Sequence, residues 1–228
     1  MFSGDCQYTF REVFSLINRK KIIASVSFLV AFLLWTVAVA TVDVQPIGPE
    51  NSRVGFASLN QFVHQLTGIH MTLYTITDWL GLVPIGVAFG FAILGLVQWI
   101  KRKSLLKVDR SLLALGGFYM VVLAAYIFFE IVVINYRPVL LGGYLEASYP
   151  SSTTMLVMCV MPAAMMQLHE RIKNDVFRRC MMISIAVFIA FMVIGRLMSG
   201  VHWLSDIIGG ALLSAGLVII YASVSVHK

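Results

Sequence analysis

Charged residues are scarce in this sequence. Asp, Glu, Lys and Arg make up only 12% of its 228 residues, whereas 59% are hydrophobic, and the mean hydropathy is +0.88. Soluble globular domains carry about twice that charged fraction, because they need a polar surface. The composition therefore excludes an ordinary soluble domain and indicates an integral membrane protein.

Cysteine is scarce too. Cys6 precedes the first apolar run, while Cys159 and Cys180 lie in or beside later apolar runs. A disulfide needs two cysteines on the oxidising side of a membrane. These three positions supply no such pair, so we expect no disulfide on the outer face.

The sequence also lacks the alternating apolar and polar residues of transmembrane β-strands. It has instead six apolar runs near the length of about 20 residues that a helix needs to cross the hydrocarbon core. They cover residues 22–42, 80–100, 111–135, 152–168, 180–198 and 203–225. Their short connections favour a single membrane domain over residues 1–228. We predict an all-α polytopic membrane protein with six transmembrane helices.

The first apolar run has a second interpretation. Ala38, Val39 and Ala40 form a small-x-small pattern after an apolar run and a basic leader, as in a cleavable signal peptide. The apolar core of such a peptide is about 7 to 15 residues long, and this run is longer. We therefore interpret 22–42 as a retained transmembrane helix.

Basic residues divide unevenly between the two ends of the predicted helices. Of 17 Lys and Arg, all but Arg53, Arg137 and Arg196 fall before the first run, between the second and third, between the fourth and fifth, or at the end of the chain. The positive-inside rule then predicts a multi-pass protein of the cell (inner) membrane with both termini cytoplasmic. Because topology explains the net charge of +6, that charge gives no support for nucleic-acid binding.

The outer face carries one long loop, about 43–79. Within residues 56–68 of this loop, Phe56, Leu59, Phe62, Val63 and Leu66 recur at helical spacing, with polar residues on the opposite side. This pattern predicts an amphipathic helix that lies on the membrane surface, where it is also able to cover a site.

Several polar groups gather on that same face. Arg137 and Arg196 lie at the outer ends of the third and fifth runs, and His202 and Asp206 are four residues apart at the start of the sixth. Hydroxyl residues follow Pro150 where the fourth run begins: Ser151, Ser152, Thr153 and Thr154. A helix N-terminus and arginines both favour an anion. Taken one at a time, each feature has an ordinary structural role: an arginine is an interfacial anchor, a Pro-Ser-Ser sequence is a helix cap, and a His-Asp pair is a local hydrogen bond. Taken together on one face, they favour phosphate chemistry.

These residues resemble the motifs of the type 2 phosphatidic acid phosphatase superfamily, which is related to vanadium haloperoxidases. The family motifs are KxxxxxxRP, PSGH and SRxxxxxHxxxD. The third reads GRLMSGVHWLSD here, with Gly195 in place of the serine. The first reads EIVVINYRP, with Glu130 in place of the lysine, and the second reads PSST, with Thr153 in place of the histidine. The resemblance covers about residues 80–225.

The resemblance implies that His202 attacks phosphorus, that Asp206 orients its imidazole, and that Arg137 and Arg196 neutralise the phosphoryl oxygens. This agrees with the chemistry of an oriented histidine nucleophile and with the positive charge that phosphoryl transfer needs. It implies no metal and no other cofactor. We expect Ser151, Ser152, Thr153 and Glu130 to bind the substrate.

Glu130 has three interpretations. It lies seven residues before Arg137, so a continuous helix would place both on nearly the same face, about 10 Å apart. An intramembrane carboxyl group is a functional hypothesis by default. Glu130 is either a structural partner of a neighbouring helix, a protonated acid, or a carboxylate that binds a cationic substrate group.

We therefore expect a lipid phosphate or diphosphate phosphatase whose active site faces outward and whose partners are its lipid substrate and membrane lipids. A polyprenyl diphosphate is the expected substrate, because Thr153 cannot protonate a departing alkoxide at neutral pH, whereas a phosphate leaving group does not need that proton. The alternatives are a catalytically silent relative that binds or transports a lipid phosphate, and a headgroup phosphotransferase. The sequence leaves the oligomeric state open.

Overall fold

The structure is a computed structural model that describes residues 10–225, with side chains from residue 18 onward. Residues 1–9 and 226–228, which include Cys6 and Lys228, lie outside the described range. Within that range the chain is almost entirely helical and has only isolated β-bridges. The prediction of an all-α protein is confirmed.

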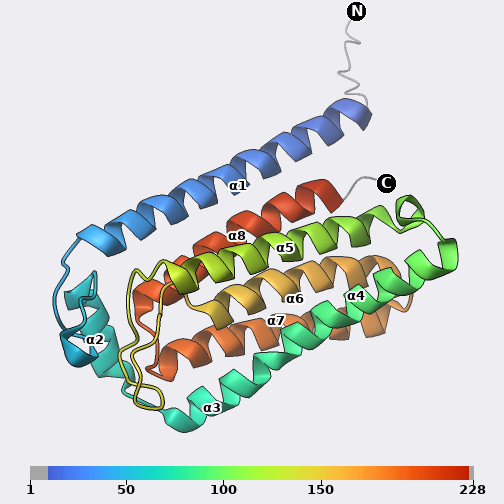
Figure 1. The fold of residues 1–228 in the computed structure, drawn as a ribbon. Helices are drawn as coiled ribbons and strands as arrows, with labels where there is room; N and C mark the ends of the chain where they lie inside the picture. Colours follow the sequence, from blue (N-terminus) through green and yellow to red (C-terminus); the bar gives the residue numbers. More distant parts are fainter. Residues whose placement is uncertain (1–9, 226–228) are drawn as a thin grey trace, which may run out of the picture.

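Long helices lie side by side in one bundle (Figure 1). They are α1 (Phe10–Thr41), α4 (Leu82–Arg102), α5 (Arg110–Ile131), α6 (Ser152–Arg171), α7 (Asp175–Met198) and α8 (Leu204–Ser225). The shorter helices α2 (Ala57–Thr67) and α3 (Met71–Leu80) lie towards one end of the bundle, and single 3-10 turns occur at Pro49–Asn51 and Leu105–Lys107.

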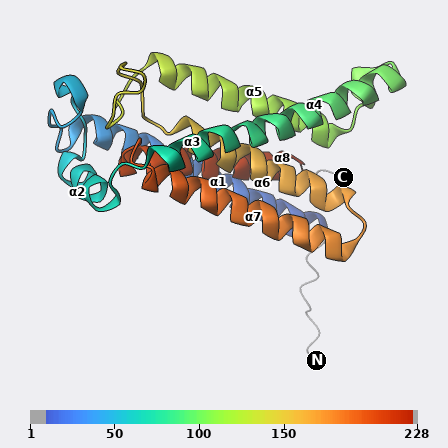
Figure 2. The same ribbon diagram turned by 90° about the horizontal axis from the view of Figure 1, so that it is seen from below.

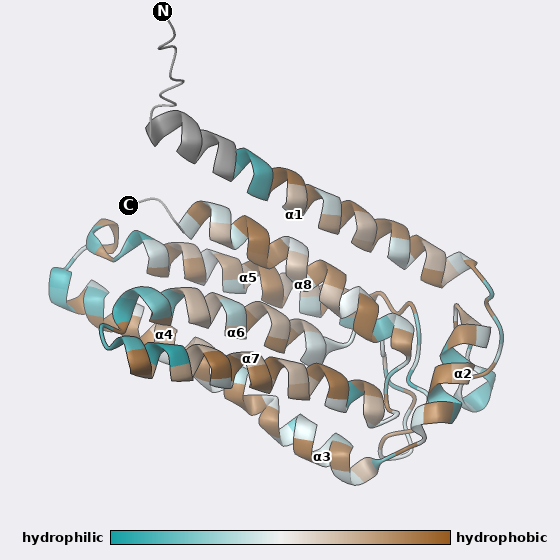
Figure 3. Cartoon of the chain, turned by 180° about the vertical axis from the view of Figure 1, so that it is seen from behind, coloured by the Kyte–Doolittle hydropathy of each residue, from teal (hydrophilic) through white to brown (hydrophobic). Residues whose placement is uncertain are grey.

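Five segments of the described chain are long and apolar enough to cross a membrane: Asn18–Thr41, Met71–Arg102, Arg110–Ile131, Asp175–Met198 and Leu204–Ser225. These segments make the chain a multi-pass membrane protein. Figure 3 shows the same pattern, with apolar residues along the helices and polar residues gathered near their ends.

The sixth predicted span, 152–168, corresponds to α6, which is not among those five segments. This helix packs against α4, α5, α7 and α8 and lies inside the bundle (Figure 2). Because neighbouring helices rather than lipid surround α6, it tolerates polar residues that have partners. Gln167, for example, is buried and donates a hydrogen bond to the Tyr221 hydroxyl at 2.6 Å.

Two helix boundaries differ from the prediction. The run 80–100 begins earlier, because α3 leads into α4 through Gly81 with almost no break, so the outer loop is shorter than 43–79. The run 111–135 ends early, at Ile131. Beyond this point Tyr136 pairs with Ala147 in an antiparallel bridge, and the buried Asn135 accepts a hydrogen bond from the Gly55 amide. These contacts hold the apolar residues 132–134 outside the helix.

Helix α2 matches the predicted interfacial helix in position but differs in the role of its polar side. Leu59, Phe62 and Leu66 are exposed, as a helix lying in the lipid interface requires. Asn60, however, is fully buried, and its amide nitrogen donates to the Ser205 hydroxyl at 2.9 Å. At Asn60 the polar side of α2 therefore contacts the start of α8, whereas Gln61 and Gln65 are exposed.

Candidate phosphate site

The predicted catalytic residues meet at one end of the bundle, where three loops and helix ends come together. Arg196 lies in the last turn of α7, His202 in the connection to α8, and Asp206 in the first turn of α8. Arg137 lies in the loop between α5 and α6 rather than at a helix end. All four are brought together through the contacts described below.

Both arginines approach the same nitrogen of His202. Arg137 Nη1 lies 3.2 Å and Arg196 Nη2 3.3 Å from His202 Nε2. Arg196 and His202 are only 1% and 2% exposed. Because guanidinium groups only donate hydrogen bonds, Nε2 is their acceptor and carries a lone pair. The site thus holds an unprotonated imidazole nitrogen between two cations.

The pKa of His202 lies well below its ordinary value. Burial is the main cause, and the positive charges of Arg137 and Arg196 lower the pKa further. The imidazole is therefore neutral at physiological pH, as a nucleophile must be.

His202 and Asp206 do not form the direct pair that their spacing suggested. His202 Nδ1 is 4.0 Å from Asp206 Oδ2, beyond hydrogen-bond distance. The reason is that His202 precedes α8, so the i,i+4 geometry of a helix does not apply to it. Ser148 lies between them: its Oγ is 3.0 Å from His202 Nδ1 and 2.5 Å from Asp206 Oδ2.

Asp206 is a buried carboxylate with several hydrogen-bond donors. Its Oδ2 accepts from the Trp203 amide at 2.9 Å, in the manner of a capping box at the start of α8. Its Oδ1 accepts from Asn135 Nδ2 at 3.3 Å and from Ser205 Oγ at 3.4 Å. These bonds compensate for the cost of burying the charge and fix the carboxylate in place.

Each arginine also has a carboxylate partner that the sequence did not indicate. Arg137 Nε is 3.1 Å from Glu146 Oε2, and Arg196 Nη1 is 3.6 Å from Asp78 Oδ1. Both carboxylates are about half exposed, at 45% and 56%. Helix α3 adds Tyr74, whose ring centroid lies 4.9 Å from the Arg196 guanidinium carbon. Glu146 lies in the same loop as Arg137, whereas Asp78 in α3 is far in sequence from Arg196 in α7, so no helical spacing could have indicated either pair.

The glycine that departs from the third motif has a structural explanation. A Cβ atom at Gly195 would lie 2.8 Å from Thr77 Cγ2, closer than side chains approach each other. The hydroxyl of Thr77 in turn accepts from Arg196 Nη1 at 3.4 Å. Gly195 therefore lets α3 pack closely on α7 and present Thr77 to the arginine.

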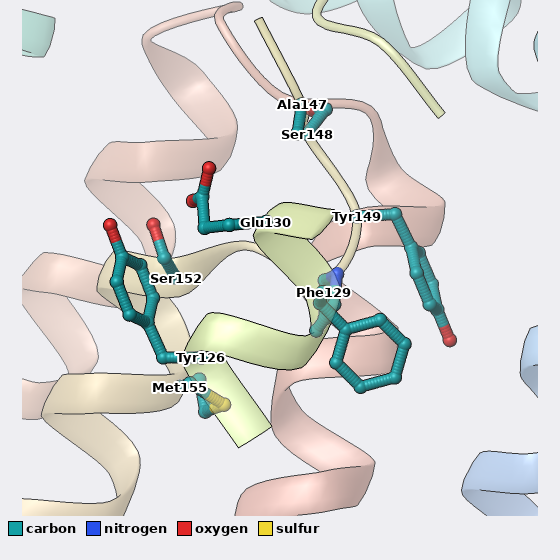
Figure 4. Close-up of a pocket in the computed structure, with 9 residues that line it drawn as sticks. Tyr126, Phe129, Glu130, Ala147, Ser148, Tyr149, Ser152 and Met155 are labelled. Atoms are coloured by element: carbon teal, nitrogen blue, oxygen red, sulfur yellow. The ribbon is translucent and has the colours of Figure 1, made fainter. Parts of the chain in front are cut away.

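Glu130 does not share a helical face with Arg137, because α5 ends at Ile131. It lines a small pocket together with Ser148, Ser152 and Tyr126 (Figure 4). The expected arrangement over two helical turns is therefore wrong, although Glu130 still lies next to a residue that contacts His202.

The three hydroxyl residues predicted to bind substrate separate into two groups. Ser151 is buried, and its Oγ caps α6 by accepting from the Thr154 amide at 3.4 Å. Ser152 and Thr153 instead line a larger cavity of about 730 Å³ between α4, α5 and α6. The walls of this cavity are mostly apolar, from Leu82 to Val160, and Asp78 also lines it.

Comparisons with known proteins support the resemblance to the phosphatase superfamily. Residues 116–228 match the family model of the PAP2 superfamily. The fold is similar to that of a transmembrane PAP2-type phosphatidylglycerolphosphate phosphatase from Bacillus subtilis, with a TM-score of 0.51 and 20% identity. The match covers 87% of this chain and 94% of the other. No curated protein sequence matches the chain.

Proposed function

Because the chain belongs to the PAP2 superfamily, we propose that it is a membrane phosphatase that hydrolyses a lipid phosphate or diphosphate through a phosphohistidine at His202. One observation carries this proposal: the lone pair of His202 Nε2 lies between the guanidinium groups of Arg137 and Arg196. A bound phosphoryl group meets both its charge partners and its nucleophile at this point.

The reaction has two displacements. In the first, the lone pair of His202 Nε2 forms a bond to phosphorus, and the bond from phosphorus to the bridging oxygen of the lipid breaks with its electron pair on that oxygen. In the second, a water oxygen attacks phosphorus, the phosphorus–nitrogen bond breaks, and its electron pair returns to Nε2. Arg137 and Arg196 stabilise the charge on the phosphoryl oxygens in both steps.

The cavity between α4, α5 and α6 supports a lipid substrate. Its volume of about 730 Å³ and its largely apolar lining suit an acyl or isoprenoid chain. Asp78 lines this cavity and also pairs with Arg196, so the cavity adjoins the phosphate site.

We propose a diphosphate in preference to a monoester, because in the described part of the chain neither His64 nor His70 replaces the acid that the second motif lacks at Thr153. His64 Nε2 is 3.1 Å from the Gly200 carbonyl, and His70 Nε2 is 2.9 Å from the Thr67 carbonyl, so both imidazoles have partners of their own. An alkoxide leaving group needs a proton, and a positioned acid contributes about 10²- to 10⁴-fold to such a step. A phosphate leaving group has its second ionisation near pKa 6 and departs without one.

Glu130 keeps two roles in this proposal. Its pocket contains Ser148 and Ser152, so its carboxyl group is placed either to protonate a leaving group or to bind a cationic headgroup. We propose further that the site faces the outer leaflet of the inner membrane. The basic connections between α4 and α5 and between α6 and α7 lie at the opposite end of the bundle from the site (Figure 1).

A second candidate is a relative that binds a lipid phosphate without hydrolysing it. The observation in its favour is that both arginines already have carboxylate partners, Glu146 and Asp78, while Glu130 replaces a cation of the family motif. A phosphotransferase is distinguished from both by turnover that depends on an acceptor other than water.

The test is release of phosphate by the purified protein from polyprenyl diphosphate, polyprenyl monophosphate and phosphatidic acid. We expect release from the diphosphate first, and a phosphoenzyme that His202→Ala abolishes. Phosphate release retained by the His202→Ala protein would exclude the covalent mechanism. Binding of the same lipids without any release would favour the silent relative.

A further inference from the structure

The hydroxyl group of Ser148 occupies the gap between the His202 imidazole and the Asp206 carboxylate. It lies 3.0 Å from His202 Nδ1 and 2.5 Å from Asp206 Oδ2, whereas these two groups are 4.0 Å apart. We propose that Ser148 is the positioning residue through which Asp206 orients His202. This inference rests on the proposed function, in which His202 Nε2 is the nucleophile.

The direction of each hydrogen bond follows from the chemistry of the groups. The Asp206 carboxylate only accepts, so the Ser148 hydroxyl donates to it. The lone pairs of the Ser148 oxygen then accept the proton on His202 Nδ1. With the proton held at Nδ1, the lone pair of the ring lies on Nε2, between the arginines. Ser148 therefore selects the tautomer that the reaction needs.

The surrounding loop holds this hydroxyl in place. Ser148 is buried, and its amide donates to the Asn135 carbonyl at 2.9 Å. The next residue, Tyr149, is buried too: its ring contacts Phe32 and Phe129, and its hydroxyl is 2.6 Å from Thr36 Oγ1. Because neighbours on both sides fix the backbone, the Ser148 oxygen has little freedom to leave the gap.

Replacement of Asp206 by asparagine shows why the serine matters. An asparagine at this position keeps its oxygen towards the Trp203 amide, which only donates, so the Ser148 hydroxyl still donates to that oxygen. The acceptor is now neutral, so the hydrogen bond is weaker and the Ser148 oxygen holds the Nδ1 proton of His202 less firmly. This loss passes through the serine, so the cost of Asp206→Asn depends on whether Ser148 is present.

A double-mutant cycle tests this dependence. We expect Ser148→Ala to lower kcat about 10- to 100-fold, the range of a hydrogen bond to a charged network, with KM changed by less than about 3-fold. Ser148→Thr, which keeps the hydroxyl, should recover most of kcat. Asp206→Asn should cost much less in the Ser148→Ala background than in the wild type. Costs that simply multiply would show that the serine does not connect the two residues.

The control is Ser214→Ala, which also removes a buried hydroxyl, one that donates to the Met155 carbonyl at 3.3 Å in the bundle core. We expect this variant to keep wild-type kcat. An equal loss of kcat in Ser214→Ala and Ser148→Ala would assign both effects to packing and overturn the proposal.

A second readout does not need activity. In ¹⁵N spectra of histidine-labelled protein, with the His202 signals assigned by their loss in His202→Gln, we expect His202 to be protonated at Nδ1 alone in the wild type. This preference should weaken in Ser148→Ala, where the arginine donors at Nε2 still favour it but the hydroxyl acceptor at Nδ1 is gone. A wild-type proton on Nε2 would overturn the role of Ser148. If no lipid phosphate is hydrolysed, the proposed function fails, while this spectrum still decides the position of the proton.

Discussion

Restoring the serine of the family motif at Gly195 should damage this protein rather than improve it. A Cβ atom there would lie 2.8 Å from Thr77 Cγ2, and the methyl group cannot swing away freely. The Thr77 hydroxyl donates to the Leu73 and Tyr74 carbonyls at 2.9 and 3.0 Å and lies 3.4 Å from Arg196 Nη1. Rotation of the threonine would therefore break these contacts, including that with the arginine of the phosphate site.

The size of the effect follows from the overlap. Overpacking of a well-packed interior costs about 1 to 3 kcal/mol, and each kcal/mol lowers Tm by about 2 to 4 °C in a chain of this length. We expect Gly195→Ser to lower Tm in detergent by about 2 to 12 °C and to raise KM for the lipid substrate, because Arg196 loses its support.

The matched rescue is Thr77→Ser, which removes only the methyl group that the new side chain meets and keeps the hydroxyl. Gly195→Ser with Thr77→Ser should recover most of the Tm and KM that Gly195→Ser alone loses. Thermal unfolding and phosphate release measured on the four proteins decide the matter. A Gly195→Ser protein as stable and active as wild type, or a double variant no better than Gly195→Ser, would refute the packing explanation.

Three further outcomes are expected. Gly200→Ala should reduce turnover far more than Gly143→Ala in the same assay. Both glycines have positive φ, but only at Gly200 would a Cβ atom meet the backbone, 2.0 Å from the Gly68 carbonyl oxygen, in the loop that carries His202. Thr153→His should raise hydrolysis of lipid monophosphates relative to diphosphates of the same chain length, because it restores an acid; an unchanged ratio would contradict the leaving-group explanation. The acid limb of the kcat/KM profile should lie below the ordinary pKa of histidine, because the pKa of His202 is lowered. It should move to higher pH in Arg137→Gln, because this variant lacks one of the positive charges that lower that pKa; a limb that stays in place belongs to the substrate.

The sequence alone was sufficient for those features that depend on composition and short-range spacing. Apolar runs predicted the membrane helices, because transfer to lipid depends on each segment's own residues. The run 152–168 predicted α6 as well, but α6 is not among the five segments apolar enough to cross a membrane. Its partners are other helices, so its position inside the bundle does not require a wholly apolar surface. Helix α3 was assigned to a loop, because residues such as Tyr74 and Asp78 face Arg196 rather than lipid.

In the candidate site, the motif spacing predicted that His202, Asp206 and both arginines act together, but not how they contact one another. The distance between His202 and Asp206 depends on the residue at which α8 begins, and a shift of one turn decides whether the pair is direct or bridged. Ser148 and Asp78 are far in sequence from His202 and Arg196, and Glu146 meets Arg137 only because their shared loop folds back on itself, so the folded chain is needed to bring all three to the site.

The two arginine–carboxylate pairs also bear on how the proposed enzyme treats its own product. Inorganic phosphate must displace Glu146 and Asp78 from the arginines, and it has no hydrocarbon chain to offset that competition. A lipid substrate meets the same competition but gains the contacts of the apolar cavity. Such a site releases free phosphate readily, and product occupies it only at a high phosphate concentration. It therefore distinguishes substrate from product by the lipid chain rather than by the charge they share.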